Sequence, residues 1–125
     1  MNGLAIWLSA VLLLAGCGSS FGPGFSCSDK MYFAEQPVVI KKDGQYFLRW
    51  RYGEWGFYFQ PEYKIKNHAL WFSLQGTTSS GDYRGRMVEM PIEGRKEIEA
   101  LQTGGAFWWE RDGAAVMALT ILEIK

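Results

Sequence analysis

Residues 38–52 read Val38-Val39-Ile40-Lys41-Lys42-Asp43-Gly44-Gln45-Tyr46-Phe47-Leu48-Arg49-Trp50-Arg51-Tyr52, and their pattern is the clearest indication of a β fold in the chain. Asp-Gly at its centre tolerates the positive φ angles of a two-residue type I′ turn, so the stretch predicts a β-hairpin that joins Val38–Lys41 to Tyr46–Tyr52. In the second arm, large apolar side chains at even positions alternate with Phe47 and two arginines. A period of two is typical of an antiparallel strand, and we expect the even-numbered face to meet a core.

Short runs that contain aromatic or β-branched residues, bounded by turn residues, follow along the chain. We expect strands at Gly56–Gln60, Tyr63–Asn67, Leu70–Gln75, Arg86–Met90, Phe107–Arg111 and Ala115–Ile124, with Asp112-Gly113 as a second hairpin turn. Glu93–Gln102 instead favours a helix, because Ile98 and Leu101 share one helical side and Gly104-Gly105 follows. The sequence therefore predicts a mainly β fold: a small antiparallel β-barrel or sandwich of about eight strands with one short helix before the last hairpin.

The amino-terminal residues have the features of an export signal. Leu4–Ala15 contains no charged side chain, but it is shorter than the roughly 20 residues that a membrane-spanning helix needs. The run ends in Leu14-Ala15-Gly16-Cys17, which resembles the lipobox of bacterial lipoproteins, where a peptidase cuts before a diacylglycerol-modified cysteine. The resemblance implies lipidation of Cys17 and attachment to a membrane. A buried apolar strand or helix is the alternative for residues 1–16.

This resemblance divides the chain into three parts. We expect a signal peptide at residues 1–16, a lipid-anchored flexible linker at 17–26, and a single β-rich domain at 27–125. Gly18 stands where an Asp would favour retention in the inner membrane of Gram-negative bacteria, so the resemblance implies an outer-membrane protein that faces the periplasm. If Cys17 is acylated, Cys27 has no partner within the chain. We expect Cys27 to be buried; pairing with another molecule is the alternative.

Composition gives little support to catalysis or to nucleic-acid binding. Net charge is zero and both signs are interspersed, which does not indicate a nucleic-acid partner. The one histidine, His68, falls in a turn-like segment, and a zinc site needs about four converging ligands. Gly76–Gly81 resembles a phosphate loop, but Asp82 stands where the phosphate-binding lysine belongs. We therefore predict no catalytic residue, no metal and no cofactor.

Basic and aromatic residues suggest a binding surface. Arg49 and Arg51 share one strand face, Lys64 and Lys66 share another, and Trp55 lies in an aromatic run between these segments. If the two faces converge, they form a surface for a phosphate-bearing envelope component or an acidic protein. The alternative is a solvated sheet face above an aromatic core.

Two short motifs near the carboxyl end resemble those of the membrane-bound inhibitors of C-type lysozyme, which are small β-barrel lipoproteins. The motifs are Ser79-Ser80-Gly81-Asp82-Tyr83 and Phe107-Trp108-Trp109-Glu110-Arg111-Asp112-Gly113-Ala114-Ala115. The resemblance implies that Ser80 and Arg111 project into the lysozyme cleft, with arginine replacing the lysine of the family. The chain departs from the family in lacking a carboxyl-terminal cysteine to pair with Cys27.

Together these features predict a non-enzymatic, membrane-anchored envelope lipoprotein that binds an envelope protein or glycan or has a structural role. The alternative is a periplasmic inhibitor or immunity-type protein that blocks lysozyme or a delivered toxin. A hydrolase or transferase has the least support, because no constellation of nucleophile, acid and base is present.

Overall fold

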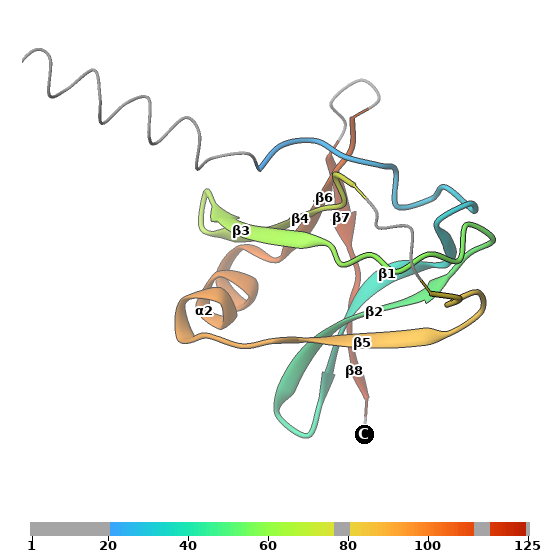
Figure 1. Ribbon diagram of the computed structural model, residues 1–125. Coiled ribbons are helices and arrows are strands. Elements are labelled where there is room, and N and C mark those ends of the chain that lie inside the picture. Colours follow the sequence, from blue (N-terminus) through green and yellow to red (C-terminus); the bar gives the residue numbers. More distant parts are fainter. Residues whose placement is uncertain (1–20, 77–80, 112–115, 125) are drawn as a thin grey trace, which may run out of the picture.

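The strands form two four-stranded sheets in the computed structural model, which describes residues 21–76, 81–111 and 116–124 (Figure 1). The first sheet has the order β5-β2-β1-β8 and the second sheet has the order β3-β4-β6-β7. The first comprises β1 (Phe33–Lys42), β2 (Gln45–Tyr52), β5 (Met87–Ile92) and β8 (Ile121–Ile124). The second comprises β3 (Glu62–Lys66), β4 (Ala69–Ser73), β6 (Ala106–Trp109) and β7 (Val116–Leu119).

The hairpin predicted from residues 38–52 is confirmed. Asp43 and Gly44 have φ angles of 53° and 77°, as a type I′ turn requires, and Lys42 pairs with Gln45 across it. Along β2 the even-numbered residues are buried and the odd-numbered ones are partly or fully exposed. β1 extends further back than expected, to Phe33, through two irregularities in its pairing with β2.

Two parallel pairings depart from the antiparallel pattern that the sequence predicts. β8 pairs with β1 and β6 pairs with β4, in both cases in parallel. The first arises because the strand expected at Ala115–Ile124 is divided: β7 joins the second sheet and β8 joins the first, with Thr120 between them. The Thr120 carbonyl accepts a hydrogen bond from the Val39 N–H at 2.9 Å, which links the two sheets at this edge.

The strand predicted at Gly56–Gln60 is wrong. These residues form an irregular segment, and Phe59 within it is 2% exposed. The Tyr52 hydroxyl replaces a neighbouring strand: it donates to the Phe59 carbonyl at 2.8 Å and accepts from the Phe59 N–H at 3.4 Å. A buried segment can thus meet its backbone hydrogen bonds without joining a sheet.

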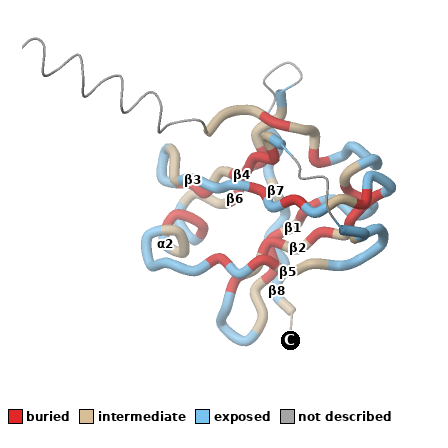
Figure 2. The backbone as a smooth tube through the Cα atoms, viewed as in Figure 1, coloured by how far each residue is buried: buried red, intermediate tan, exposed pale blue. Residues whose placement is uncertain are grey.

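The core lies between the two sheets, so the sandwich is the correct one of the two predicted architectures. Figure 2 shows the buried positions gathered in the middle of the molecule. Phe33 from the first sheet meets Trp108 from the second edge to face, with ring centroids 5.4 Å apart. The expected helix, α2 (Arg95–Gly104), packs against β3 and β4, buries Leu101, and ends where the Gly105 N–H donates to the Leu101 carbonyl.

The first described residues are part of the second sheet. β4 and β6 diverge after Phe72 and Trp108, and residues 22–25 fill the gap between them. Gly24 exchanges hydrogen bonds with Trp109 and Arg111, and a Cβ at this position would lie 2.1 Å from the Leu74 carbonyl oxygen, so only glycine fits. Hydrogen-bonded structure therefore begins within residues 17–26, the range that the sequence assigned to a linker.

The predicted signal peptide at residues 1–16 and Cys17 lie outside the described residues. No helix in the described ranges has the length and apolar character needed to cross a membrane.

Candidate binding surfaces

Arg49 and Arg51 lie on the outer face of the first sheet, and both are held in ion pairs. Arg49 donates to the Glu89 carboxylate through Nε at 3.0 Å and Nη2 at 2.6 Å, and Lys42 reaches the other oxygen of Glu89 at 3.1 Å. These hydrogen bonds, with Arg49 the larger influence, lower the pKa of Glu89. Arg51 pairs with Glu35 and also donates to the Gly85 carbonyl at 2.6 Å. The two arginines therefore tie neighbouring strands together.

Lys64 and Lys66 lie on the outer face of the second sheet, where their surroundings are aromatic. Lys64 is opposite Trp71, which is opposite Phe107 on β6. The Lys66 ammonium lies 4.4 Å from the centre of the Trp71 ring and 4.1 Å from the centre of the Trp109 ring. We call this surface the Lys66 face; it comprises Phe21, Lys64, Lys66, Trp71, Phe107 and Trp109.

The structure does not bring the two predicted basic pairs together. Leu48 and Trp50 point into the core from β2, as Leu70 and Phe72 do from β4, so the residues between them point away from the core. The arginine pair and the lysine pair therefore belong to the outer faces of different sheets. The two basic pairs therefore do not converge on one surface.

Trp55 belongs to a different cluster, at one end of the sandwich. Its backbone N–H donates to the Met31 carbonyl at 2.7 Å, and the centre of its ring lies 5.0 Å from that of Phe57, edge to face. Trp55 is 37% exposed. Nearby, the ring centroids of Tyr58 and Tyr83 are 5.5 Å apart, and the Arg86 guanidinium lies 5.0 Å from the centre of the Tyr83 ring. We call this cluster the aromatic end; it comprises Trp55, Phe57, Tyr58, Tyr83, Arg84 and Arg86.

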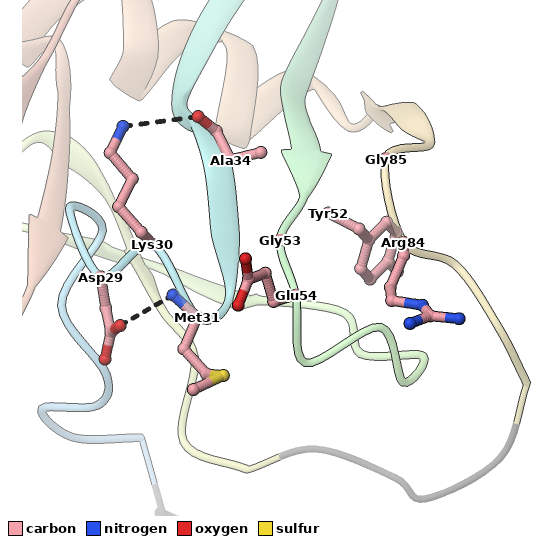
Figure 3. Close-up of a pocket in the computed structure, with 9 residues that line it drawn as sticks. All are labelled: Asp29, Lys30, Met31, Ala34, Tyr52, Gly53, Glu54, Arg84 and Gly85. Atoms are coloured by element: carbon pink, nitrogen blue, oxygen red, sulfur yellow. Dashed lines mark hydrogen bonds between the residues drawn. The ribbon is translucent and has the colours of Figure 1, made fainter.

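Three adjoining hollows surround the aromatic end. The largest, of about 620 Å³, lies between residues 29–34 and the turn at 84–85, and Figure 3 shows Asp29 and Lys30 on one side with Arg84 on the other. Glu54 and Arg84 also line a hollow of about 310 Å³ beside Trp55. Tyr52 lines both the largest hollow and an aromatic pocket of about 260 Å³ that Tyr58 and Tyr83 also line. Volumes of this size suit a peptide side chain or a small ligand.

Local hydrogen bonds hold the charged groups around the largest hollow. The Asp29 carboxylate accepts the Met31 N–H at 3.0 Å, and Lys30 donates to the Ala34 carbonyl at 3.4 Å, as the dashed lines in Figure 3 mark. Arg84 pairs with Asp82 at 3.1 Å and lowers the pKa of that carboxyl. The hollow thus has charges of both signs at its rim.

Sequence reasoning missed Tyr83, Arg84 and Arg86 as candidate residues. A signal for these residues is present in the sequence: residues 83–86 mix aromatic and basic side chains, as the stretches at 49–55 and 63–66 do. The position of residues 83–86 beside Trp55 depends on a contact between distant residues, the hydrogen bond from the Tyr83 N–H to the Gly56 carbonyl at 2.6 Å, which no local pattern predicts.

The remaining predicted residues fall at separate places. Cys27 is 3% exposed, as expected; burial, followed by the nearby Glu110 carboxylate, raises its pKa to about 12. His68 is exposed in the turn between β3 and β4 and has a φ of 62°. Arg111 is exposed, with its guanidinium 5.2 Å from the Phe25 ring centre. Ser80 and the Asp112-Gly113 turn lie outside the described residues.

Among the described residues no group of three or more His, Cys, Asp or Glu side chains is arranged to hold a metal ion. Comparison of the chain with protein-family models, with curated proteins and with solved structures finds no match.

Proposed function

We propose that the protein is a non-enzymatic lipoprotein of the bacterial envelope whose β-sandwich binds another envelope molecule through the aromatic end. The observation that supports this most is the exposure of Trp55 and Tyr58, 37% and 38%, beside adjoining hollows and next to arginines. Trp, Tyr and Arg are the residues that most often dominate binding energy at protein interfaces, particularly where they border a pocket.

The charges at the aromatic end favour a protein partner or an uncharged glycan. Arg84 and Arg86 are accompanied by Glu54 and Asp82, and Asp82 is already paired with Arg84. A surface with both signs gives little long-range attraction for a polyanion, so specificity must come from shape, aromatic contact and individual hydrogen bonds.

A lipid on Cys17 anchors the domain to the membrane in the function that we propose. Lipidation of Cys17 is supported by Leu14-Ala15-Gly16-Cys17 and by the short apolar run before it. Gly18 after the cysteine supports the outer membrane, with the domain in the periplasm. Two or more acyl chains attach a protein stably to a membrane, whereas one chain gives only marginal binding.

The second candidate function is a periplasmic inhibitor or immunity-type protein that blocks lysozyme or a delivered toxin. One observation favours it: described residues of both lysozyme-inhibitor-like motifs border the same aromatic network. Tyr83, from the first motif, belongs to the aromatic end. Arg111, from the second motif, lies over the Phe25 ring. The Phe25 ring stacks on the Tyr32 ring with centroids 4.5 Å apart, and the Tyr32 and Trp55 ring centroids are 5.9 Å apart.

Affinity capture from detergent-solubilised envelope tests the proposal. The acylated protein and its Trp55→Ala variant are compared with a control, Lys96→Ala, which alters an exposed residue of α2. We expect one stoichiometric envelope component with the wild type and the control, and at least about a tenfold loss with Trp55→Ala. Equal capture by all three proteins contradicts the aromatic end as the binding site.

A lysozyme activity assay separates the two functions. Saturable inhibition of C-type lysozyme that Arg111→Ala weakens supports the inhibitor. An unchanged rate of cell-wall hydrolysis at stoichiometric excess leaves the binding role as the better account of the aromatic end.

A further inference from the structure

The Lys66 face combines cationic and apolar groups, and Glu62 shares the outer face of β3 with the two lysines. Neither lysine forms an ion pair with any described residue, in contrast to the paired arginines of the first sheet. On the adjoining strand β7, Val116 is opposite Trp109 and Ala118 is opposite Phe107, and both are exposed. The apolar surface therefore continues from the aromatic rings to the edge of the sheet.

The side chains of this face are those that suit the boundary between lipid and water. Aromatic rings are enriched there, and lysine places its stem on apolar groups while its ammonium reaches anions. The Trp71 ring contributes through its apolar surface, because its N–H is buried and has no hydrogen-bond partner among the described residues. The Lys66 ammonium lies 4.4 Å from the centre of the Trp71 ring and 4.1 Å from the centre of the Trp109 ring. Cation–π contact with these rings holds the ammonium against the face.

The chain enters the domain at this face. The Phe21 ring lies 5.9 Å from the Trp109 ring, and residues 22–25 are hydrogen-bonded between β4 and β6. Phe21 is the fourth residue after Cys17. Even a fully extended chain spans at most about 3.3–3.6 Å per residue, so the chain from Phe21 back to the lipid-bearing residue can reach no further than about 14 Å. A lipid on Cys17 therefore keeps the membrane close to the Lys66 face.

We propose that the Lys66 face lies against the anionic surface of the bilayer that holds the lipid of Cys17. This inference rests on the proposed lipidation of Cys17, and it adds a defined orientation to the anchored domain. The occupant is a membrane rich in anionic phospholipid, because Lys64 and Lys66, which form no ion pair with a described residue, attract phosphate groups and the partly exposed aromatic rings contact the headgroup layer. Each lysine near such a surface strengthens binding about fivefold.

The orientation also accounts for the placement of the proposed binding site. In Figure 1 the turn after β2 and the segment before β5, which carry the aromatic end, lie on the right, away from the start of the blue amino-terminal segment. A domain seated on its Lys66 face leaves the aromatic end free to meet a partner in the periplasm.

Depth-dependent fluorescence quenching tests the inference with the mature, acylated protein in phosphatidylcholine vesicles that contain phosphatidylglycerol. Ala118→Cys places a thiol-reactive bimane probe beside Phe107, and Val116→Cys is a second reporter on the same strand. The control is Gln45→Cys, an exposed position on the outer face of the first sheet. Cys27 gives little background labelling, because its thiol is buried and has a pKa of about 12.

We expect headgroup-labelled quencher lipid to quench both β7 probes at least about threefold more than the Gln45 probe. The difference should fall by more than half in the Lys64→Gln/Lys66→Gln double variant or without phosphatidylglycerol. Equal quenching of the β7 and Gln45 probes overturns the inference, as does a difference that is insensitive to both lysines and anionic lipid.

The same samples distinguish failure of this inference from failure of the proposed function. Mass spectrometry of the mature protein shows whether Cys17 is acylated, and vesicle flotation shows whether the protein is anchored. An acylated, floating protein with unquenched β7 probes overturns the orientation and retains the anchor. A mature protein without acyl chains on Cys17 overturns the proposed anchor, and the orientation that rests on it falls with it.

Discussion

The outer faces of the two sheets carry similar alternating basic pairs but use them differently. On the first sheet, Arg49 and Arg51 are matched by Glu89 and Glu35 from neighbouring strands. On the second, Lys66 rests on two indole rings, and neither lysine meets a carboxylate of a described residue. Alternating basic residues thus form ion pairs between strands where the neighbouring strands carry carboxylates. Where the neighbouring strands carry aromatic rings, the basic residues keep a charge that is not neutralised by a described carboxylate.

The first prediction concerns the apolar residues among these basic pairs. Trp50 points into the core and is 2% exposed, whereas Trp71 points outward and is only partly buried. We expect Trp50→Ala to lower the free energy of unfolding by about 3–5 kcal/mol and Trp71→Ala to lower it by about half as much. Urea denaturation followed by circular dichroism measures both, and an equal cost would mean that the outer face is packed as closely as the core.

The second-largest effect is expected when Glu89, the acid of two ion pairs on the first sheet, is replaced. Glu89→Gln leaves Arg49 and Lys42 without their carboxylate, so we expect a loss of about 1–2 kcal/mol, above that of a fully exposed pair because Glu89 is only 26% exposed. Glu62→Gln is the control, since Glu62 is exposed on β3 and makes no ion pair among the described residues. Similar melting curves for Glu89→Gln and Glu62→Gln would contradict the claim that ion pairs stabilise the outer face of the first sheet more than that of the second.

The free energy of unfolding should also depend on pH through the Glu89 carboxylate. Arg49 and Lys42 lower the pKa of folded Glu89, so the unfolded chain takes up the proton first as the pH falls. The stabilisation is complete above the ordinary glutamate pKa and is lost as the pH falls through the folded value. The gap in stability between wild type and Glu89→Gln should therefore narrow below about pH 4.5. A gap that stays constant down to about pH 3 would show that ionisation of Glu89 does not cause it.

The fourth and smallest effect concerns the lysine of the second sheet. Lys66→Met keeps an unbranched apolar stem over Trp71 and Trp109 and removes the charge. We expect the free energy of unfolding to change by no more than about 0.5–1 kcal/mol, the usual size of a cation–π contact. Thermal denaturation at low salt measures this, and a loss above about 2 kcal/mol would assign Lys66 a mainly structural role.

The sequence predicted what local patterns determine. The Asp43-Gly44 turn, the alternation along residues 46–52 and the helix ending at Gly104-Gly105 all follow from turn geometry and side-chain period. These features depend on residues close together in the chain, and so a single sequence carries enough information to place them.

The features that the sequence missed depend on distant contacts. The segment at Phe59 reads as a strand, but its hydrogen bonds go to the Tyr52 side chain rather than to a neighbouring strand. Thr120 gives no local signal that the chain changes sheets there. Glu89, the partner of Arg49, is 40 residues away, so no local pattern showed that the arginine was paired. The candidate site was therefore assembled from residues that belong to separate surfaces.

Photocrosslinking in the intact envelope tests most directly whether the outer face of the second sheet is the one that meets the membrane. Benzoylphenylalanine is introduced at Ala118 on the second sheet and, in a separate protein, at Gln45 on the first. After irradiation, the mass of the acylated protein reports what each position touches. A phospholipid adduct at Ala118 and none at Gln45 is the result we predict. A phospholipid adduct at Gln45 but not at Ala118, or at both positions equally, would contradict the difference between the two faces.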